Sequence, residues 1–457
     1  MNAEDQAVSA GKQRGFARFF KSEAIGSILL AFCTIAALGW ANSPWSGAYF
    51  HLTHAKVGFS WNDSKFVLSW VHWINDGLMA LFFFVVGLEI KREIVVGELS
   101  TVKKAILPVA AALGGMVLPA IVYFAINHGG PGAAGWGIPI ATDIAFALGV
   151  LALLGPRVPL SLKIFLTALA IADDLGAVLV IAIFYTERIS FSHLIAAVLF
   201  LGLLVLAARL KIRSVAIYAV LVAGVWLGIL ASGIHATVAG ILVAMVVPVR
   251  SRIQPKRFLA IAHQQLAELG GSDLSGEHPT LNAQQMEALD QLHQATYDVI
   301  PAGPAFEHYL HPVTAYFILP LFALFNAGVV IDYKIVEALT HPVGLGVLLG
   351  LLLGKQAGIT AASWLVIRFR LADMPAGVTW AQIHASAILA GIGFTMALFV
   401  TDLAIGEEQL VGFSKIGVLT ASALCAAGGY YALRMALNRT PVQETQSDLE
   451  LQHGQAG

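Results

Sequence analysis

Long apolar runs recur along the chain between residues 24 and 436, and short polar connections separate them. One helical crossing of a bilayer needs about 20 predominantly apolar residues. Backbone that faces lipid must form helices or a closed barrel, so each long run predicts a transmembrane helix. The pattern predicts twelve crossings, at residues 24–42, 69–91, 104–126, 135–154, 159–185, 191–210, 214–231, 233–249, 311–332, 342–366, 380–403 and 411–435.

Polar segments flank this apolar region, which we interpret as one transmembrane domain over residues 24–436. Residues 1–23 are expected to form a cytoplasmic N-terminal segment, and residues 437–457 a disordered cytoplasmic tail. The longest connection inside the domain, residues 251–305, is polar and rich in glutamine. It is expected to be a cytoplasmic loop that is helical in part, from Leu281 to Ile300.

One connection on the opposite side has the pattern of a strand pair. Residues alternate from His54 to Trp61, and Asn62 and Asp63 follow them. Such a pattern predicts a short β-hairpin, placed outside between the first two crossings. An exposed hairpin of this kind permits a homodimer contact.

The positions of lysine and arginine test this topology, because positive residues favour cytoplasmic loops. With the N-terminus inside, 21 of the 27 lysines and arginines lie on the cytoplasmic side, five lie outside and Lys355 lies within a crossing. The cytoplasmic set is Lys12, Arg14, Arg18, Lys21, Lys91, Arg92, Lys103, Lys104, Arg157, Lys163, Arg209, Lys211, Arg213, Arg250, Arg252, Lys256, Arg257, Arg368, Arg370, Arg434 and Arg439. This distribution supports an even number of crossings with both termini in the cytoplasm.

Composition agrees with a multi-pass membrane protein. The chain is 58% hydrophobic and 12% charged, whereas soluble domains carry roughly 25% charged residues. A formal net charge of −1 gives no basic excess that would indicate a nucleic-acid partner. Cys33 and Cys425 have no metal-ligand spacing around them, and we expect both to be buried apolar fillers.

Two adjacent carboxylates, Asp173 and Asp174, stand in the middle of the fifth predicted crossing. One aspartate at the centre of a spanning helix costs roughly 2.5–3.5 kcal/mol on insertion scales, so such a pair needs protein or trapped water around it. Neighbouring carboxylates resist ionising together, and the pair is therefore suited to carry protons near neutral pH. When both are ionised, the pair attracts a cation.

Lys355 is the only basic residue predicted at the same depth. Asp173 and Asp174 point about 100° apart around a helix, so one can face a water-filled cavity while the other meets a partner. A purely structural ion pair would account for Lys355 and one aspartate. It would leave the second aspartate unexplained.

Two predicted crossings carry helix-breaking residues. Asp143 follows Pro139, which removes a helical hydrogen bond and favours an unwound segment. Gly391 and Gly393 interrupt the eleventh crossing in the same way, although glycines there could simply allow close helix packing. Paired interruptions in the two halves of a chain indicate a transporter site. Asp143 would then offset the positive helix ends, and Lys355 the negative ends.

The remaining ionisable candidates have weaker support. Asp76 can be a further site residue or can simply hydrogen-bond inside the bundle. Glu307, His308 and His311 lie at the inner end of the ninth predicted crossing and could titrate between about pH 6 and 8. Interfacial histidines often have no such role. Four charged residues at the inner end of the second crossing are expected to form a solvated cluster, namely Glu89, Lys91, Arg92 and Glu93.

These motifs, taken in order, resemble the NhaA family of bacterial sodium/proton antiporters. The matching segments cover most of the chain, and they are 73–80, 86–89, 141–155, 173–177, 232–237, 319–323, 326–329, 354–355 and 391–396. The resemblance implies an all-helical fold with inverted-topology repeats and two unwound, crossing helices, for which the family is a known example. It also implies the bacterial inner membrane, and exchange of cytoplasmic Na+ or Li+ for more than one external H+.

The resemblance also assigns roles to single residues. Asp174 matches the principal sodium ligand, and Asp173 the residue paired with Lys355 in the ion-free state. Thr142 and Asp143 match residues at the crossing of the unwound helices. The region of Glu307, His308 and His311 matches one associated with activation by pH. No cofactor is implied, because Na+, Li+ and H+ are the transported ions.

These observations predict competition of sodium and protons for one site, with activity rising toward alkaline pH. Sodium prefers oxygen ligands, which Asp173, Asp174, carbonyl groups and water could supply. An intramembrane aspartyl protease also needs two carboxylates, but its Gly-x-Gly-Asp and Tyr-Asp motifs are absent from the sequence. A cation channel would need repeated pore segments, which the sequence does not contain. We therefore expect an antiporter that is not an enzyme.

Overall fold

The computed structural model of the chain describes residues 24–61, 64–186, 189–210, 212, 214–270, 283–331 and 335–439. The predicted N-terminal segment 1–23 lies outside the described residues, as do residues 440–457 of the predicted tail and the turn at Asn62 and Asp63. The described part is almost entirely helical, with one two-stranded sheet. Contacts divide the chain into two compact units, the first comprising 1–28, 106–176 and 329–457 and the second 29–105 and 177–328.

Nine helical segments of the described residues are long and apolar enough to cross a bilayer. They are Ala24–Ala41, Val102–Asn127, Ala133–Leu153, Leu160–Phe184, Phe191–Arg209, Val215–Ser232, Ala302–Asn326, Pro342–Arg368 and Glu408–Asn438. The pair Trp380–Leu389 and Phe394–Ala404, bent by 48° at its break, makes a tenth if it is one span. The all-helical, multi-pass membrane class is thus confirmed, while the count of twelve, the inverted repeats and the full crossing of unwound helices stay predictions.

Two predicted crossings differ from their expected form. Residues 69–91 begin in a strand, and the helical run continues from Trp70 to Val95. For 233–249, the helix is only Thr237–Val246, which is about 15 Å long and half of a bilayer core. The cause is Gly233, whose φ of 87° ends the preceding helix in the left-handed region that glycine tolerates.

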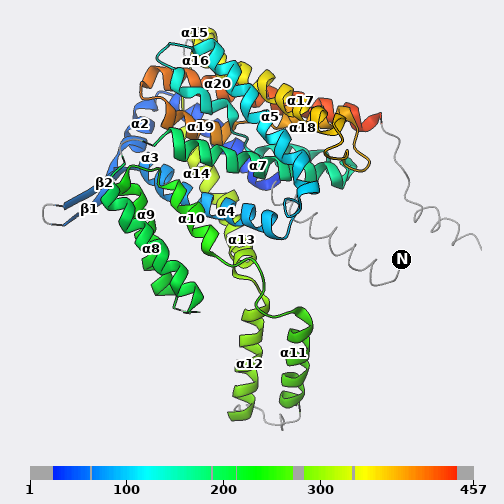
Figure 1. The fold of residues 1–457 in the computed structure, drawn as a ribbon. Helices are drawn as coiled ribbons and strands as arrows, with labels where there is room; N and C mark the ends of the chain where they lie inside the picture. Colours follow the sequence, from blue (N-terminus) through cyan, green and yellow to red (C-terminus); the bar gives the residue numbers. More distant parts are fainter. Residues whose placement is uncertain are drawn as a thin grey trace, which may run out of the picture. The chain divides into compact units, whose positions relative to one another are not determined.

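The first unit holds the helices of the aspartate pair and both interrupted segments (Figure 1). Its elements are α5 (Val102–Asn127, from residue 106), η2 (Ala133–Ile140), α6 (Ile144–Leu153), η3 (Gly155–Arg157), α7 (Leu160–Phe184, to residue 176), α15 (Ile335–Thr340), α16 (Pro342–Leu349), η5 (Gly350–Gly354), α17 (Lys355–Arg368), α18 (Trp380–Leu389), α19 (Phe394–Ala404) and α20 (Glu408–Asn438). Small residues let helix backbones approach closely here. A Cβ on Gly114 would lie 2.3 Å from the carbonyl oxygen of Gly358.

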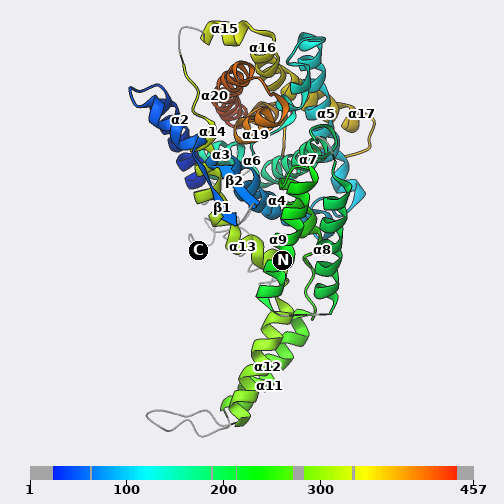
Figure 2. The same ribbon diagram turned by 90° about the vertical axis from the view of Figure 1, so that its left-hand side faces the viewer.

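The second unit contains the sheet and a helical hairpin outside the predicted crossings (Figure 2). Its elements are the helix Ala24–Ala41 (from residue 29), α2 (Ser46–His54), β1 (Lys56–Trp61), β2 (Ser64–Ser69), α3 (Trp70–His72), η1 (Trp73–Leu78), α4 (Met79–Val95), α8 (Phe191–Arg209), α9 (Val215–Ser232), α10 (Thr237–Val246), α11 (Pro255–Gly270), α12 (Ala283–Val299), α13 (Ala302–Val313), η4 (Thr314–Ile318) and α14 (Leu319–Asn326). The strands pair antiparallel in a register from Lys56 with Ser69 to Trp61 with Ser64, which confirms the predicted hairpin.

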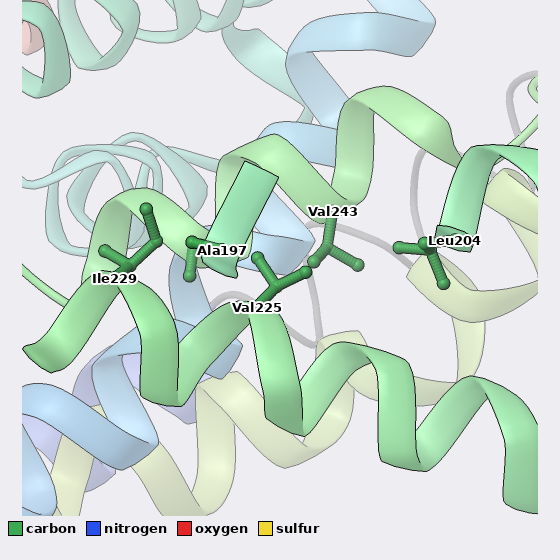
Figure 3. Close-up of a cluster of buried hydrophobic side chains, with 6 residues drawn as sticks. Ala197, Leu204, Val225, Ile229 and Val243 are labelled. Atoms are coloured by element: carbon green, nitrogen blue, oxygen red, sulfur yellow. The ribbon is translucent and has the colours of Figure 1, made fainter. Parts of the chain in front are cut away.

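Packing within the second unit depends on small and aliphatic side chains. Figure 3 shows Ala197, Leu204, Val225, Ile229 and Val243 meeting where α8, α9 and α10 pack together. Close approach of α10 to α4 leaves no room for a side chain at Gly240, where a Cβ would lie 2.1 Å from the carbonyl oxygen of Ala80. Apolar side chains that face lipid gain little from burial, so close contact of this kind holds membrane helices together.

One of the two cysteines is buried as expected, and the other is not. Cys425 on α20 is fully buried, and a Cβ on Gly391 would meet its Sγ atom at 2.7 Å. Cys33 is only partly buried. Its helix has apolar residues on all sides, and Ile28, Phe32 and Ile35 among them are exposed. The weakly polar thiol of Cys33 therefore does not need to be buried on this helix.

Candidate functional site

Asp173 and Asp174 lie near the middle of α7, and both side chains are inside the first unit. Their exposed fractions are 0% and 1%, so neither faces lipid nor solvent. The structure therefore differs from the expectation that one of the two carboxylates faces a water-filled cavity. Tight packing of α7 explains the closure, because a Cβ on Gly176, two residues later, would lie only 2.2 Å from the sulfur of Met116 on α5.

Lys355 meets Asp173 as the sequence suggested. Its Nζ atom lies 2.8 Å from Oδ2 of Asp173, and Lys355 is 0% exposed. Asp174 also lies within electrostatic reach of the ammonium group. An ion pair in such surroundings has lost the hydration of both charges, so its net contribution to stability is small while the loss of one partner is costly.

Glycines let the helix that carries Lys355 pack closely against α5. The residue begins α17 directly after the π-helical turn η5. A Cβ on Gly354 would lie 2.8 Å from the backbone of Pro119 on α5, and one on Gly115 would lie 2.8 Å from the side chain of Ile359 on α17. Sequence analysis included Gly354 in the segment 354–355 but did not identify Gly115, and the packing role of each depends on a helix distant in the sequence.

A second contact links the ammonium group to an interrupted helix. Lys355 also donates a hydrogen bond to the carbonyl oxygen of Ile140, the last residue of the 3-10 helix η2. Carbonyl groups at a helix end have no partner within that helix and carry partial negative charge. The expected proximity of Lys355 to a negative helix end is therefore present.

The chain is extended between η2 and α6, at the point where Pro139 led us to expect unwinding. Asp143 follows this break as the N-cap of α6, and its Oδ1 accepts the N–H of Phe146 at 2.9 Å. Asp143 is only 2% exposed. Its carboxylate thus satisfies one free N–H group and faces the positive end of α6.

The same carboxylate caps a second helix. Oδ2 of Asp143 accepts the N–H of Thr395 at 3.0 Å and the hydroxyl of Thr395 at 2.5 Å, in the first turn of α19. The N–H of Asp143 donates to the carbonyl oxygen of Ile392 at 2.7 Å. Thr142 donates its hydroxyl to the carbonyl oxygen of Ala390 at 2.9 Å. The two interruptions therefore meet through polar contacts.

Thr395 is the site residue whose role sequence analysis missed. It belongs to the quoted segment 391–396, and its hydroxyl and N–H both bind a carboxylate 252 positions away. An N-terminal threonine in a helix usually caps its own helix, so the local sequence did not indicate this partner. The carboxylates of Asp173 and Asp174, together with backbone oxygens, are the groups that the first unit offers a cation. In the described residues, no group of three or more His, Cys, Asp or Glu side chains could hold a metal ion.

The other candidates lie in the second unit. Asp76 is half-buried in the π-helix η1, and its carbonyl oxygen accepts the indole N–H of Trp226 at 2.8 Å. Its neighbour Asn75 exchanges side-chain hydrogen bonds with Asn326 at 3.2 and 3.0 Å. π-helical turns often occur at functional sites.

The helix of the ninth predicted crossing begins nine residues earlier than that crossing, because α13 begins at Ala302 rather than at residue 311. Glu307 and His311 are one turn apart on this helix and are half-buried, whereas His308 is exposed and contacts the ring of Tyr309. The polar side chains concealed the start of the apolar helix. All three candidates consequently lie inside the span Ala302–Asn326.

Glu307 pairs with the charged residues at the end of α4. Nε of Arg92 lies 3.0 Å from Oε2 of Glu307, and another guanidinium nitrogen lies 3.3 Å from Oε1 of Glu93. Lys91 donates to the carbonyl oxygens of Met245 and Val247 at the end of α10. The predicted solvated cluster is therefore corrected to a set of paired charges that connect helix ends, since unpaired carbonyl groups there attract cations.

Comparisons with known proteins agree with this arrangement. The family model described as Na+/H+ antiporter 1 matches residues 17–433. A protein named Na(+)/H(+) antiporter NhaA from Oleidesulfovibrio alaskensis is 47% identical over 423 residues, which are 92% of this chain and 94% of the relative. Na(+)/H(+) antiporter NhaA 2 from Syntrophotalea carbinolica is 45% identical over 93% of this chain and 97% of that protein. Na(+)/H(+) antiporter NhaA from Sulfurimonas denitrificans is 44% identical over 92% of this chain and 95% of that protein.

The family match covers both interrupted helices, the aspartate pair and Lys355, so it includes every residue of the first unit's polar site. The relatives extend over nearly the same length. A likeness of this extent goes beyond a shared fold. The chain, a multi-pass helical membrane protein, belongs to the Na+/H+ antiporter 1 family.

Proposed function

We propose that the protein exchanges cytoplasmic Na+ for external H+ at one site formed by Asp173 and Asp174. The observation that carries this proposal is the burial of two adjacent carboxylates in an apolar helix, with one of them 2.8 Å from a buried lysine. Intramembrane ionisable residues in such surroundings mark ion or proton pathways. Membership of an antiporter family supports the same exchange.

In this proposal, Asp174 is the principal sodium ligand and Asp173 carries protons together with Lys355. A sodium ion needs several oxygen ligands, and the two carboxylates would contribute part of them. Protons bind the same oxygens. Loading one ion therefore expels the other, and competition alone couples the two fluxes.

The ion pair of Lys355 and Asp173 represents the ion-free side of this cycle. When sodium binds, its charge weakens the attraction between the lysine and the carboxylate. When the carboxylate takes a proton, the lysine loses its partner. Each transition changes the charge in a desolvated place, where electrostatic interactions are strong.

Access to the site requires movement, because neither aspartate is exposed. The break between α18 and α19, bent by 48°, and the extended residues before α6 are suited to allow it. Asp143 and Thr395 hold these breaks together, and they would keep two helix ends aligned while the surrounding helices rock between inward and outward access.

Finer properties of the exchange belong to the same proposal. Exchange of more than one H+ per Na+ makes transport electrogenic, and the membrane potential then contributes about 2.3 kcal/mol per charge per 100 mV. Li+, a smaller hard cation, is accepted by the same oxygen ligands. Protonated carboxylates leave no sodium site, so exchange rises toward alkaline pH. Glu307, His308 and His311 would tune that rise.

In the cell, the protein would reside in the bacterial inner membrane with both termini in the cytoplasm. There it would extrude sodium and help to keep the cytoplasmic pH constant. The outer hairpin of β1 and β2 would contribute to a homodimer. The distribution of lysine and arginine supports the placement of the termini, and family membership supports the role in sodium extrusion.

The test uses purified protein in vesicles with a preset pH gradient and a fluorescent pH indicator. Sodium should collapse the gradient in a pH-dependent way between pH 6 and pH 9, and Asp174→Asn should abolish the collapse. Asp373→Asn, an exposed aspartate outside the spans, is the matched control and should retain exchange. Full exchange by Asp174→Asn would rule out the shared site.

A further inference from the structure

Three helices of the first unit, α7, α17 and α18, extend from one end of the unit toward the ion pair of Lys355 and Asp173. At that end, Ser161 near the start of α7 donates its hydroxyl to the carbonyl oxygen of Ala376 at 2.6 Å. Ala376 belongs to the connection between α17 and α18. The positive residues of this connection led us to expect the same end in the cytoplasm. The three helices therefore connect the expected cytoplasmic end of the unit with the proposed ion site.

The helices α17 and α18 lie side by side (Figure 1). Oγ1 of Thr360 on α17 lies 3.1 Å from Nδ1 of His384 on α18. Nearer the break that ends α18, a Cβ on Gly391 would lie 2.7 Å from the carbonyl oxygen of Leu351, just before α17. Residue numbers thus decrease along α17 as they increase along α18. The two helices are antiparallel, and each position of one has a counterpart at the same depth on the other.

Two serines of this helix pair are buried without a hydrogen-bond partner. Ser363 on α17 is 0% exposed and Ser386 on α18 is 1% exposed, and neither hydroxyl has a partner in the described part of the chain. The same holds among the described residues for Oδ1 of Asp173. Hydroxyls inside helices can donate to a carbonyl oxygen of the preceding turn, as those of Thr34 and Thr401 do. A buried hydroxyl without a partner is costly, and enclosed water commonly satisfies such groups in folded proteins.

Both serines face the interior of the first unit. Each lies more than about 140° around its helix from the centre of the exposed residues of that helix. Those exposed residues are Ala357, Ala361, Trp364, Leu365 and Arg368 on α17 and Trp380, Ala381 and His384 on α18.

The depths of the two serines follow from the antiparallel register. Ser363 is eight residues from Lys355 along α17, which is about 12 Å. The contact of Thr360 with His384 places Ser386 at the depth of residue 358, about 5 Å from the depth of Lys355. Hydrogen-bonded oxygen atoms are about 2.8 Å apart. A few water molecules are therefore enough to connect the two hydroxyls with each other and with the ion pair.

We propose that Ser363 and Ser386 hold a chain of water molecules, and that protons reach and leave Asp173 along this water chain. The inference rests on the proposed exchange at Asp173 and Asp174, and it adds a path for one of the two ions. A proton passes from one oxygen to the next, so each step forms one O–H bond as it breaks another. The last step protonates the Asp173 carboxylate and leaves a neutral water molecule behind.

The water chain is suited to protons and not to sodium. Sodium prefers several oxygen ligands, whereas a proton needs only one hydrogen-bonded oxygen at each step. The parts of the three helices between the ion pair and the expected cytoplasmic end are residues 160–172, 356–368 and 380–389, and they contain no acidic residue. Two neutral hydroxyls offer a sodium ion no charge to replace its hydration. Sodium would therefore enter the site elsewhere.

Infrared spectroscopy of the purified protein in vesicles tests whether protons reach Ser386 from the solvent. In a Cys33→Ala, Cys425→Ala background, Ser386→Cys places a thiol on the water chain. Ala385→Cys is the matched control, because Ala385 is also 1% exposed and lies on another side of α18. After transfer into D2O, the S–H band of Ser386→Cys should become an S–D band at least about tenfold faster, because a packed thiol exchanges only when the structure opens locally. Equal rates would overturn the proposal.

A pair of variants of equal shape tests whether transport uses the water chain. Valine and threonine have the same shape, and only threonine has a hydroxyl. Ser386→Val should lower the maximal rate of sodium/proton exchange about tenfold without raising the KM for sodium, because one hydrogen-bonded step is lost. Ser386→Thr should keep a maximal rate within about twofold of the parent protein. An unchanged rate in Ser386→Val, or equal losses in both variants, would refute the proton path.

Failure of the water chain can be distinguished from failure of the proposed exchange. Full exchange by Asp174→Asn would end the shared site, whatever the S–H band shows. A slow S–H band in a Ser386→Cys protein that still exchanges sodium for protons would refute only the water chain. Ala387→Cys, at a position that is 0% exposed, takes the place of Ala385→Cys if that variant does not fold.

Discussion

Each compact unit contains a cluster of opposite charges, and the two clusters differ most in burial. In the first unit, the side chains of Lys355 and Asp173 are 0% and 1% exposed. In the second, those of Arg92 and Glu307 are 37% and 20% exposed, at a similar separation of 3.0 Å. A fully buried pair is sensitive to every change of charge, whereas a partly exposed pair contributes at most about 1 kcal/mol. The first cluster is thus suited to carry ions. The second is suited to adjust the pH at which the first cluster carries them.

The largest expected effect comes from breaking the ion pair of the first cluster. Lys355→Met leaves Asp173 buried without its partner, which should lower the free energy of unfolding by about 3–5 kcal/mol. The midpoint of thermal unfolding in detergent measures the loss. The double variant Lys355→Met, Asp173→Asn should recover most of it. If the two single effects simply add, the pair is not the unit that we describe.

A smaller loss is expected where Asp143 joins two helix ends. Thr395→Val removes the hydroxyl but keeps the N–H, so the buried carboxylate of Asp143 loses one hydrogen-bond donor and the protein loses about 1–3 kcal/mol of stability. Thr34→Val is the matched control, because that hydroxyl bonds only to the carbonyl oxygen of Leu30 in its own helix. Equal thermal shifts in the two variants would contradict a special role of Thr395.

The second cluster should respond least in stability and most in pH dependence. Glu307→Gln removes the ion pair with Arg92 and should cost no more than about 1 kcal/mol. The pH of half-maximal exchange in vesicles should move by less than about one unit. His308→Gln changes an exposed side chain and should shift the pH of half-maximal exchange less than Glu307→Gln does. If His308→Gln shifts this pH more than Glu307→Gln does, then the histidine and not the ion pair regulates exchange.

Sequence analysis predicted the parts of the fold that a membrane enforces. Apolar length locates most spanning helices, and the hairpin of β1 and β2 follows from alternation and a turn. Helix starts were less accurate where polar residues occur inside a span, as at Glu307. The short α10 could not be anticipated, because apolar composition does not show that Gly233 ends one helix and that the next begins only at Thr237.

The sequence predicted which residues form the site but not which hydrogen bonds and packing contacts they make. Costly charges in an apolar run identify Asp173, Asp174 and Lys355 without knowledge of their neighbours. The double capping by Asp143 depends on a threonine 252 positions away, and no local pattern encodes such a distance. The burial of both aspartates was also not predictable, since closure depends on how α5 packs on α7 at Gly176.

The central claim is that sodium and protons compete for Asp173 and Asp174. It is tested most directly by adding sodium to purified protein in weakly buffered detergent and measuring the protons that are released. The account predicts at least one proton released per sodium bound below the pH of full activity, weaker sodium binding at lower pH, and no release from Asp174→Asn. Sodium binding without proton release would contradict it.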